Sequence, residues 1–334
     1  MTSEPDQHKT ITMVNEVTPL IQTTLTPPPN QRRKEITGLL LMALSALGFS
    51  TMSLFVKIGA SKFPSMELVF ARSVAQVLLG LIGCAILNVN PLGRPEVRLW
   101  LTLRGTVGAV GLALFFYSVT KLPLADATVV FFLGPTFTAI LAAVLLGESF
   151  TLFDGICSVS CLIGVVLVSK PRFLFGGDET GTAENALERL IAVIAGLVGA
   201  LMAAIAYVTV RKIGKGAHFM VHVVYFGFMS VVISFAGMFL IQSGGVKPDG
   251  WYDYTILLLI GVCAYIGQCL LNLGLQLAPA GPGTLMRMND VVFAFLFGIF
   301  ILHEYPDSYS IVGACIIVVM TTALGLHKWY SASN

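Results

Sequence analysis

The chain has 334 residues, a formal net charge of +2, 56% hydrophobic residues and only 11% charged residues. A soluble domain carries roughly 25% charged residues, so this chain has too few charges to cover a water-exposed surface. Lipid must therefore surround most of it, and a helical membrane protein is the expected class. The near-neutral net charge also gives no general attraction to nucleic acid.

The order of polar and apolar segments predicts ten membrane spans between polar ends. Residues 1–35 contain Pro27-Pro28-Pro29 and end in Arg32-Arg33-Lys34, which predicts a disordered tail. The polar stretch 170–189 predicts a linker between two halves, and 328–334 a short C-terminal tail. We predict transmembrane helices at 36–58, 66–88, 99–119, 126–146, 152–169, 190–212, 219–242, 253–277, 283–302 and 308–327.

Matching residues in the two halves indicate an internal duplication. Glu148 and Glu304, which close segments four and nine, lie 156 residues apart, and Pro123 and Pro279 share that offset. Lys57-Ile58-Gly59 matches Lys212-Ile213-Gly214 at an offset of 155. Five spans per half is an odd number, so the second half enters the membrane upside down, as in secondary carriers. We predict two inverted five-helix repeats, at 36–169 and 190–327.

The distribution of basic residues in the short loops favours both termini in the cytoplasm. The tail also contains Glu16, Leu20 and Ile21 in the acidic dileucine spacing Glu-x-x-x-Leu-Ile, a pattern that clathrin adaptors read as a sorting address. Chance also produces such short patterns. The plasma membrane, the endoplasmic reticulum and the endosomal or lysosomal membranes all stay open as locations.

The sequence contains no P-loop, HExxH or GxSxG motif and no cluster of His and Cys, so we expect no enzyme, no cofactor and no metal site. His222 is the one histidine in the interior of a predicted span, since His327 is the final residue of its span, and a packing or hydrogen-bonding role is expected for it. The cysteines fall inside apolar runs and are expected to be small packing residues: Cys84, Cys157, Cys161, Cys263, Cys269 and Cys315.

Four charged residues within the spans are the strongest functional signal. Arg72 and Arg104 lie about two turns into segments two and three, and Arg287 and Asp290 lie in segment nine. Each costs about 2.5–3.5 kcal/mol or more to insert, so another interaction must offset the cost. Either Arg72 and Arg104 extend to the headgroups and Arg287 pairs with Asp290, or the arginines line a polar cavity and bind an anion. The excess of arginine over aspartate favours the anion, and Asp290 is the candidate for a coupled proton.

Other polar and irregular residues complete the predicted site. Candidate hydrogen-bonding residues are Tyr117, Tyr265, Gln268 and Asn272, although each is also suited to bonding a neighbouring helix. Gly134-Pro135 interrupts segment four, and Gly281-Pro282-Gly283 opens segment nine. Irregularities in corresponding regions of two halves predict broken helices that move around a site, with Pro135, Gly281 and Pro282 as gating residues. Ordinary proline kinks are the alternative.

These residues resemble a known family. Leu122-Pro123-Leu124-Ala125-Asp126-Ala127 with Pro135, Phe137 and Glu148 resembles the EamA half-repeat of the drug/metabolite transporter superfamily. Five more stretches are similar to the G branch of solute carrier family 35: Ser53–Lys57, Leu103–Gly105, Phe173–Gly176, Asp290–Phe295 and Lys328–Tyr330. The resemblance covers roughly 36–330. It implies ten helices in two inverted repeats around a central cavity, and it does not name the substrate.

The function predicted from these observations is secondary-active or exchange transport of a small organic anion, a carboxylate or a phosphorylated metabolite, by alternating access. The alternative is a non-transporting membrane adaptor that binds another membrane protein. The expected partners are the anion, the lipid bilayer, a clathrin adaptor at the tail and a second copy of the chain.

Overall fold

The computed structural model describes residues 29–122, 129–169, 174, 183–241, 244–301, 303 and 308–333. Within these residues the chain is helical, with short turns and no strand. The helices of the first half are α1 (Pro29–Gly59), α2 (Ser65–Ile86), α3 (Arg98–Lys121), α5 (Gly134–Leu146) and α6 (Leu152–Ser169). Those of the second half are α8 (Ala183–Ile213), α9 (Phe219–Ile241), α10 (Trp251–Leu277), α11 (Ala280–Met286), α12 (Asn289–Phe300) and α13 (Ser308–Ser333). Single turns of 3-10 helix occur at Pro95–Val97 and Gly214–Gly216.

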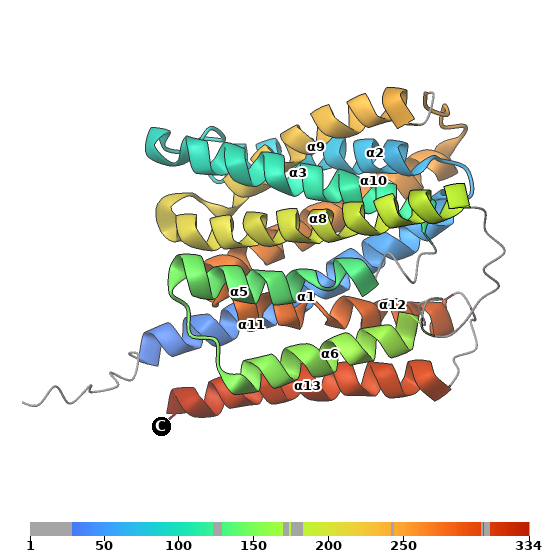
Figure 1. Cartoon of the computed structure of the whole chain (residues 1–334). Helices are drawn as coiled ribbons and strands as arrows, with labels where there is room; N and C mark the ends of the chain where they lie inside the picture. Colours follow the sequence, from blue (N-terminus) through green and yellow to red (C-terminus); the bar gives the residue numbers. More distant parts are fainter. Residues whose placement is uncertain are drawn as a thin grey trace, which may run out of the picture.

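The helices are long and apolar enough to span a bilayer. Among the described residues, nine helical stretches qualify by length and hydropathy, and the shorter apolar helix Leu152–Val168 makes a tenth. They lie side by side in one bundle, with the start of α1 and the end of α13 at the same end (Figure 1). We call this the terminal end. The prediction of an all-α membrane protein with about ten spans is confirmed.

Helix packing follows the two-repeat plan. Helix α1 packs against α10, and α8, its counterpart in the second half, packs against α3. The pairs α2 with α9 and α6 with α13 join the remaining counterparts directly. The first and third helices of each half thus interlock with those of the other half, so neither half forms a separate body (Figure 1).

One close helix contact occurs twice, once in each half. A Cβ on Gly111 in α3 would lie 3.1 Å from the backbone nitrogen of Ala203 in α8. A Cβ on Gly48 in α1 would lie 3.1 Å from the Cα of Gly267 in α10. Gly267 follows Gly111 by 156 residues and Ala203 follows Gly48 by 155. The duplication therefore extends to a backbone approach that only small residues permit.

The fourth span of each half is broken at corresponding positions. In the second half, Arg287 and Met288 form a turn between α11 and α12. In the first half, residues 129–131 are helical, 132–133 form a turn, and α5 begins at Gly134. Bonds from residue i to i−3 replace the α-helical pattern at both turns: Leu133 donates to the Val130 carbonyl at 3.3 Å, and Met288 to Leu285 at 3.0 Å. Tight turns of this kind inside a helix are often found at hinges.

The predicted irregular residues lie beside these breaks. Pro135 stands in the first turn of α5, directly after the break, where its missing N–H costs no helical bond. Gly281 and Pro282 lie in the first turn of α11, so the second break comes about one turn later than the sequence suggested. A Cβ on Gly281 would be 3.2 Å from the Cβ of Ala139, so α5 and α11 cross closely here.

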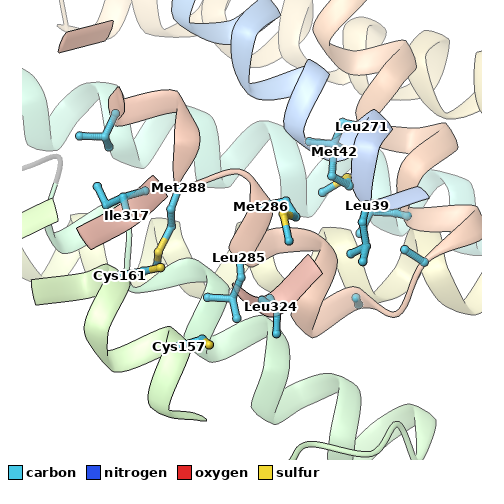
Figure 2. Close-up of a cluster of buried hydrophobic side chains, with 14 of the residues drawn as sticks. Leu39, Met42, Cys157, Cys161, Leu271, Leu285, Met286, Met288, Ile317 and Leu324 are labelled. Carbon is cyan, nitrogen blue, oxygen red and sulfur yellow. The ribbon is translucent and has the colours of Figure 1, made fainter. Parts of the chain in front are cut away.

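A buried apolar cluster surrounds α11, in which every residue is buried. Leu285 and Met286 of α11 lie among side chains from α1, α6, α10 and α13 (Figure 2). Cys157 and Cys161 contribute to the same cluster from α6, where they pack as small residues. Side chains of four other helices therefore pack around α11 up to the break at Arg287.

Several element ends differ from the predicted ones. Residues 29–35 and 183–189 are helical, so the predicted tail and linker are each shorter on the side facing a span, and α13 continues to Ser333. Hydropathy sets the predicted edges, whereas good helix formers such as Ala, Glu and Leu extend the helices beyond the lipid. The residues Glu16, Leu20, Ile21, Pro123 and Glu304 lie outside the described part of the chain, so the predictions on them remain predictions.

Candidate functional site

Arg287 stands at the break between α11 and α12, with its side chain 14% exposed. Its Nη1 donates a hydrogen bond of 2.5 Å to the hydroxyl of Tyr207 in α8. The guanidinium lies over the ring of Phe49, 4.6 Å from the centroid. Its Nη2 is 3.8 Å from Oδ2 of Asp290, one turn along the chain, and its Nε has no partner. The break thus presents a cation that the protein contacts on several sides, but one of its hydrogen-bond donors, Nε, has no acceptor.

The surroundings of Arg287 explain how a charge is held inside the membrane. Stacking on Phe49 supplies a cation–π attraction, which strengthens where water is excluded. The Asp290 carboxylate offsets the charge, although 3.8 Å is longer than the 2.7–2.9 Å of a close charge-assisted bond. The loosely paired arginine therefore keeps donor capacity for another acceptor.

Arg104 forms a second centre, in α3. Its side chain is only 2% exposed, and its Nη2 donates to Oε1 of Gln268 at 3.2 Å and to Oδ1 of Asn272 at 3.1 Å. The guanidinium stacks over the Phe226 ring at 4.7 Å. Nε and Nη1 of Arg104 have no acceptor. The structure thus brings together three of the predicted site residues, and it leaves two buried donors unfilled.

Arg72 of α2 completes the group. It is 3% exposed, its Nε has no partner, and it lies within electrostatic range of both Arg287 and the Tyr207 hydroxyl. Arg104 also lies within electrostatic range of Tyr207. Of the three arginines, Arg287 is bonded to the Tyr207 hydroxyl, whereas Arg72 and Arg104 lie within electrostatic range of it.

The carboxylates do not balance these charges. In the described part of the chain, the other buried or half-buried carboxylates lie near helix ends, and they are Glu35, Glu67, Glu148, Asp154 and Asp253. Asp290 is paired with Arg287. Three guanidinium charges and one carboxylate leave an excess of positive charge at the centre of the bundle.

Two predicted residues lie away from this centre. The Tyr265 hydroxyl reaches Sδ of Met220 at 3.2 Å, next to α2 and α9. Tyr117 lies one turn from Lys121 near the end of α3 and interacts with it electrostatically. His222 is fully buried within electrostatic range of Arg104, and neither of its ring nitrogens has a hydrogen-bond partner.

Sequence reasoning missed two contributors to the site, Tyr207 and Phe49. Tyr207 sits in a segment rich in Ala and Val, and nothing in the spacing marks it. The signal that could have indicated it is a tyrosine within an apolar span, because a phenol hydroxyl inside a span requires a hydrogen-bond partner.

The ends of the bundle carry ordinary ion pairs. At the end opposite the termini, Lys62 pairs with Asp253. Lys121 pairs with Glu188 there at 2.6 Å, and this hydrogen bond raises the pKa of Lys121 above its usual value. Across the described residues, no group of three or more His, Cys, Asp or Glu side chains is placed to hold a metal ion.

The sequence matches a family model over most of its spans. The model of the EamA-like transporter family matches residues 36–170 and again residues 190–325. The chain belongs to the EamA-like transporter family. Two matches in tandem are the repeats that the fold shows, and EamA-family membership makes the chain a multi-pass membrane transporter with a small-molecule substrate.

Individual relatives agree with the EamA-like assignment. The chain is 33% identical over 301 residues to solute carrier family 35 member G1 of Homo sapiens, covering 89% of this chain and 81% of the relative. It is 29% identical over 291 residues to the pseudopaline exporter CntI of Pseudomonas aeruginosa, covering 87% and 96%. A crystal structure of a protein 19% identical in sequence superposes with a TM-score of 0.73 over 86% of this chain, which shows the same fold.

Proposed function

We propose that this transporter is a secondary carrier of a small organic anion, a carboxylate or a phosphorylated metabolite, and that it works by alternating access. The observation that carries the proposal is that Arg287 is bonded to Tyr207 and loosely paired with Asp290, while Arg72 and Arg104 lie within electrostatic range of the same tyrosine. No enzymatic step is part of the proposal, and its energy source is a gradient or an exchange.

The unfilled donors support an anionic substrate. Nε of each of the three arginines and Nη1 of Arg104 lack acceptors. Leaving such donors empty costs free energy, and a planar guanidinium binds carboxylate or phosphate oxygens in a forked geometry. An anion bound here would both supply acceptors for these arginine donors and reduce the excess positive charge.

The breaks in the fourth and ninth spans support a change of conformation during transport. Arg287 stands at the turn between α11 and α12, and the matching turn in the first half precedes Pro135. We propose that Pro135, Gly281 and Pro282 let the two broken spans move around the site as the carrier changes state. Asp290, one turn after Arg287, is the proposed carrier of a coupled proton.

Uptake into proteoliposomes tests the function. The purified chain is reconstituted and screened with radiolabelled mono-, di- and tricarboxylates, phosphorylated sugars, and neutral and cationic metabolites of similar size. We expect saturable uptake of an anion that an unlabelled anion inhibits, and no uptake of its neutral amide or ester. Transport of a neutral or cationic compound alone would contradict the anion proposal. Correctly folded protein that transports none of these compounds would favour the membrane adaptor.

The location and assembly of the carrier are also proposals. We propose that both termini face the cytoplasm, that a clathrin adaptor reads the tail through Glu16, Leu20 and Ile21, and that two copies of the chain associate as a homodimer. Replacing Leu20 and Ile21 together with Ala should move a tagged chain towards the cell surface. An unchanged distribution by microscopy would make the tail pattern a coincidence.

A further inference from the structure

One carboxylate at the terminal end joins segments from both halves. Glu148 directly follows Gly147, whose positive φ of 65° ends α5. Its Oε1 accepts a 2.7 Å bond from Nε of Arg211 at the end of α8, and its Oε2 accepts a 2.8 Å bond from the backbone nitrogen of Ala280, the first residue of α11. Nη1 of Arg211 also donates to the Gln276 carbonyl near the end of α10, at 3.3 Å.

These residues share helix faces with the arginine site. Arg211 follows Tyr207 by four residues in α8, which places both on one face of the helix. Arg287 follows Ala280 by seven residues in the ninth span, again on one face. Tyr207 and Arg287 are bonded to each other, as Arg211 and Ala280 are joined through Glu148. The Glu148 contacts thus lie between the site and the terminal end.

The segments that Glu148 links come from different repeats. Glu148 comes from the first half, whereas Arg211 and Ala280 come from the second. In carriers built from inverted repeats, one repeat or bundle rocks against the other around a fixed site. To open a path from the site to the terminal end, these helices must separate. Glu148 then loses its bonds to Arg211 and to the Ala280 nitrogen.

The strength of the contact suits a reversible closure. Glu148 and Arg211 are half-buried, with side chains 16% and 26% exposed. Charge-assisted bonds of this kind are stronger than neutral ones, and remaining contact with water lowers the cost of separating the two charges. The carboxylate also supplies the acceptor at the start of α11, where Pro279 offers no side-chain cap.

We propose that Glu148 and Arg211 form the gate that closes the terminal side of the substrate site. The gate rests on the proposed transport by alternating access, but it does not require the substrate to be an anion. Its opening separates α5 from α8 and α11, and its closure restores the bonds to Arg211 and Ala280.

Cysteine accessibility tests the gate without any substrate. Thr284 lies in α11 between Ala280 and Arg287 on the same face, and it is buried. In a T284C variant, a membrane-impermeant methanethiosulfonate reagent is added to the terminal side of sealed vesicles, and the chain without the reporter gives the background. Glu148→Ala should raise the labelling rate about tenfold, because charge-assisted bonds no longer favour the closed state. Glu148→Gln, which keeps an acceptor for Ala280, should raise it less.

Matched variants make the result specific. Lys212→Ala removes a neighbouring cation that stacks on Trp100, and Glu188→Gln breaks the exposed pair at the opposite end. Both should leave the labelling rate unchanged. Arg211→Ala combined with Glu148→Ala should raise the rate by much less than the product of the two single effects, because both single variants break the same Glu148–Arg211 contact.

The experiments can contradict the gate proposal and the anion-site proposal independently of each other. Unchanged labelling in Glu148→Ala, with a monodisperse and thermally stable protein, would overturn the gate whatever the substrate is. Labelling that rises equally in the Lys212→Ala control would also overturn it, since general loosening would then explain the effect. Raised labelling in Glu148→Ala together with full transport by Arg287→Ala would leave the gate standing and remove the anion site.

Discussion

The two broken spans share a backbone but differ in chemistry. Leu133 and Met288, which precede α5 and α12, lie 155 residues apart and have nearly the same dihedrals, φ −68°, ψ −16° and φ −62°, ψ −19°. At the same offset Phe132 corresponds to Arg287, and Pro135 to Asp290. One break therefore carries an aromatic ring and a proline where the other carries an ion pair.

The side chains that surround the two breaks also differ. In the first half, the Phe131 ring lies 4.4 Å from that of Phe115 and contacts Phe132 edge to face. In the second half, Arg287 contacts Tyr207, Phe49 and Asp290. The comparison teaches that the duplicated break persists as backbone geometry, whereas the charged side chains are present in only one of the two copies. A hinge therefore does not by itself identify a binding site in such a fold.

The largest expected effect separates the two breaks. Arg287→Ala should lower uptake at least about 100-fold, since an ionic contact to the substrate and its orientation are lost together. Phe132→Ala, at the corresponding position, should lower uptake by less than about tenfold because only packing is lost. Arg287→Lys should keep partial activity, as charge remains without the fork. Initial uptake rates, normalised to reconstituted protein, provide the measurement. Equal losses at the two positions would remove the functional difference between the breaks.

Arg104 should have the next largest effect. Arg104→Lys should raise KM about tenfold or more with a smaller change in kcat, because a lysine cannot bridge Gln268 and Asn272 while facing a substrate. Gln268→Glu should weaken anion binding as well, since the added carboxylate neutralises the guanidinium. Concentration series for both variants check this pair of expectations. A KM unchanged by Arg104→Lys would make Arg104 a structural residue.

The smallest effect concerns the proton. If Asp290 carries it, uptake by the wild-type chain should change several-fold across roughly pH 5–8, and uptake by Asp290→Asn should be flat over that range. The corresponding Pro135 has no proton to exchange, so Pro135→Ala should keep the pH dependence of the wild type. A pH profile shared by wild type and Asp290→Asn would exclude Asp290 from coupling.

The sequence predicted the architecture well because the fold depends on signals that are local. Apolar stretches of spanning length need no partner to be recognised, and repeats are visible as offsets such as that between Glu148 and Glu304. Helix ends were less predictable: α8 begins at Ala183, since helix formers continue beyond the apolar stretch that hydropathy detects.

The site was predicted only in part because its contacts join distant helices. An arginine in a span stands out because inserting its charge into the bilayer costs free energy, so Arg104 and Arg287 were predicted as candidates from the sequence. Tyr207 was not, because its role depends on how α8 faces the break 80 residues later. Tyr265 shares helical spacing with Gln268 and Asn272, yet its hydroxyl reaches Met220, since side-chain direction depends on the neighbouring helix.

The double variant Arg287→Ala with Asp290→Asn tests the central claim most directly, because it separates a substrate-binding arginine from a structural ion pair. Each single variant leaves one half-buried partner without its counter-charge, and the double variant removes both charges. Thermal stability and uptake are measured for the four forms. The account predicts that the double variant folds with near wild-type stability and does not transport. Restored transport in the double variant would show that the pair is structural and would contradict the account.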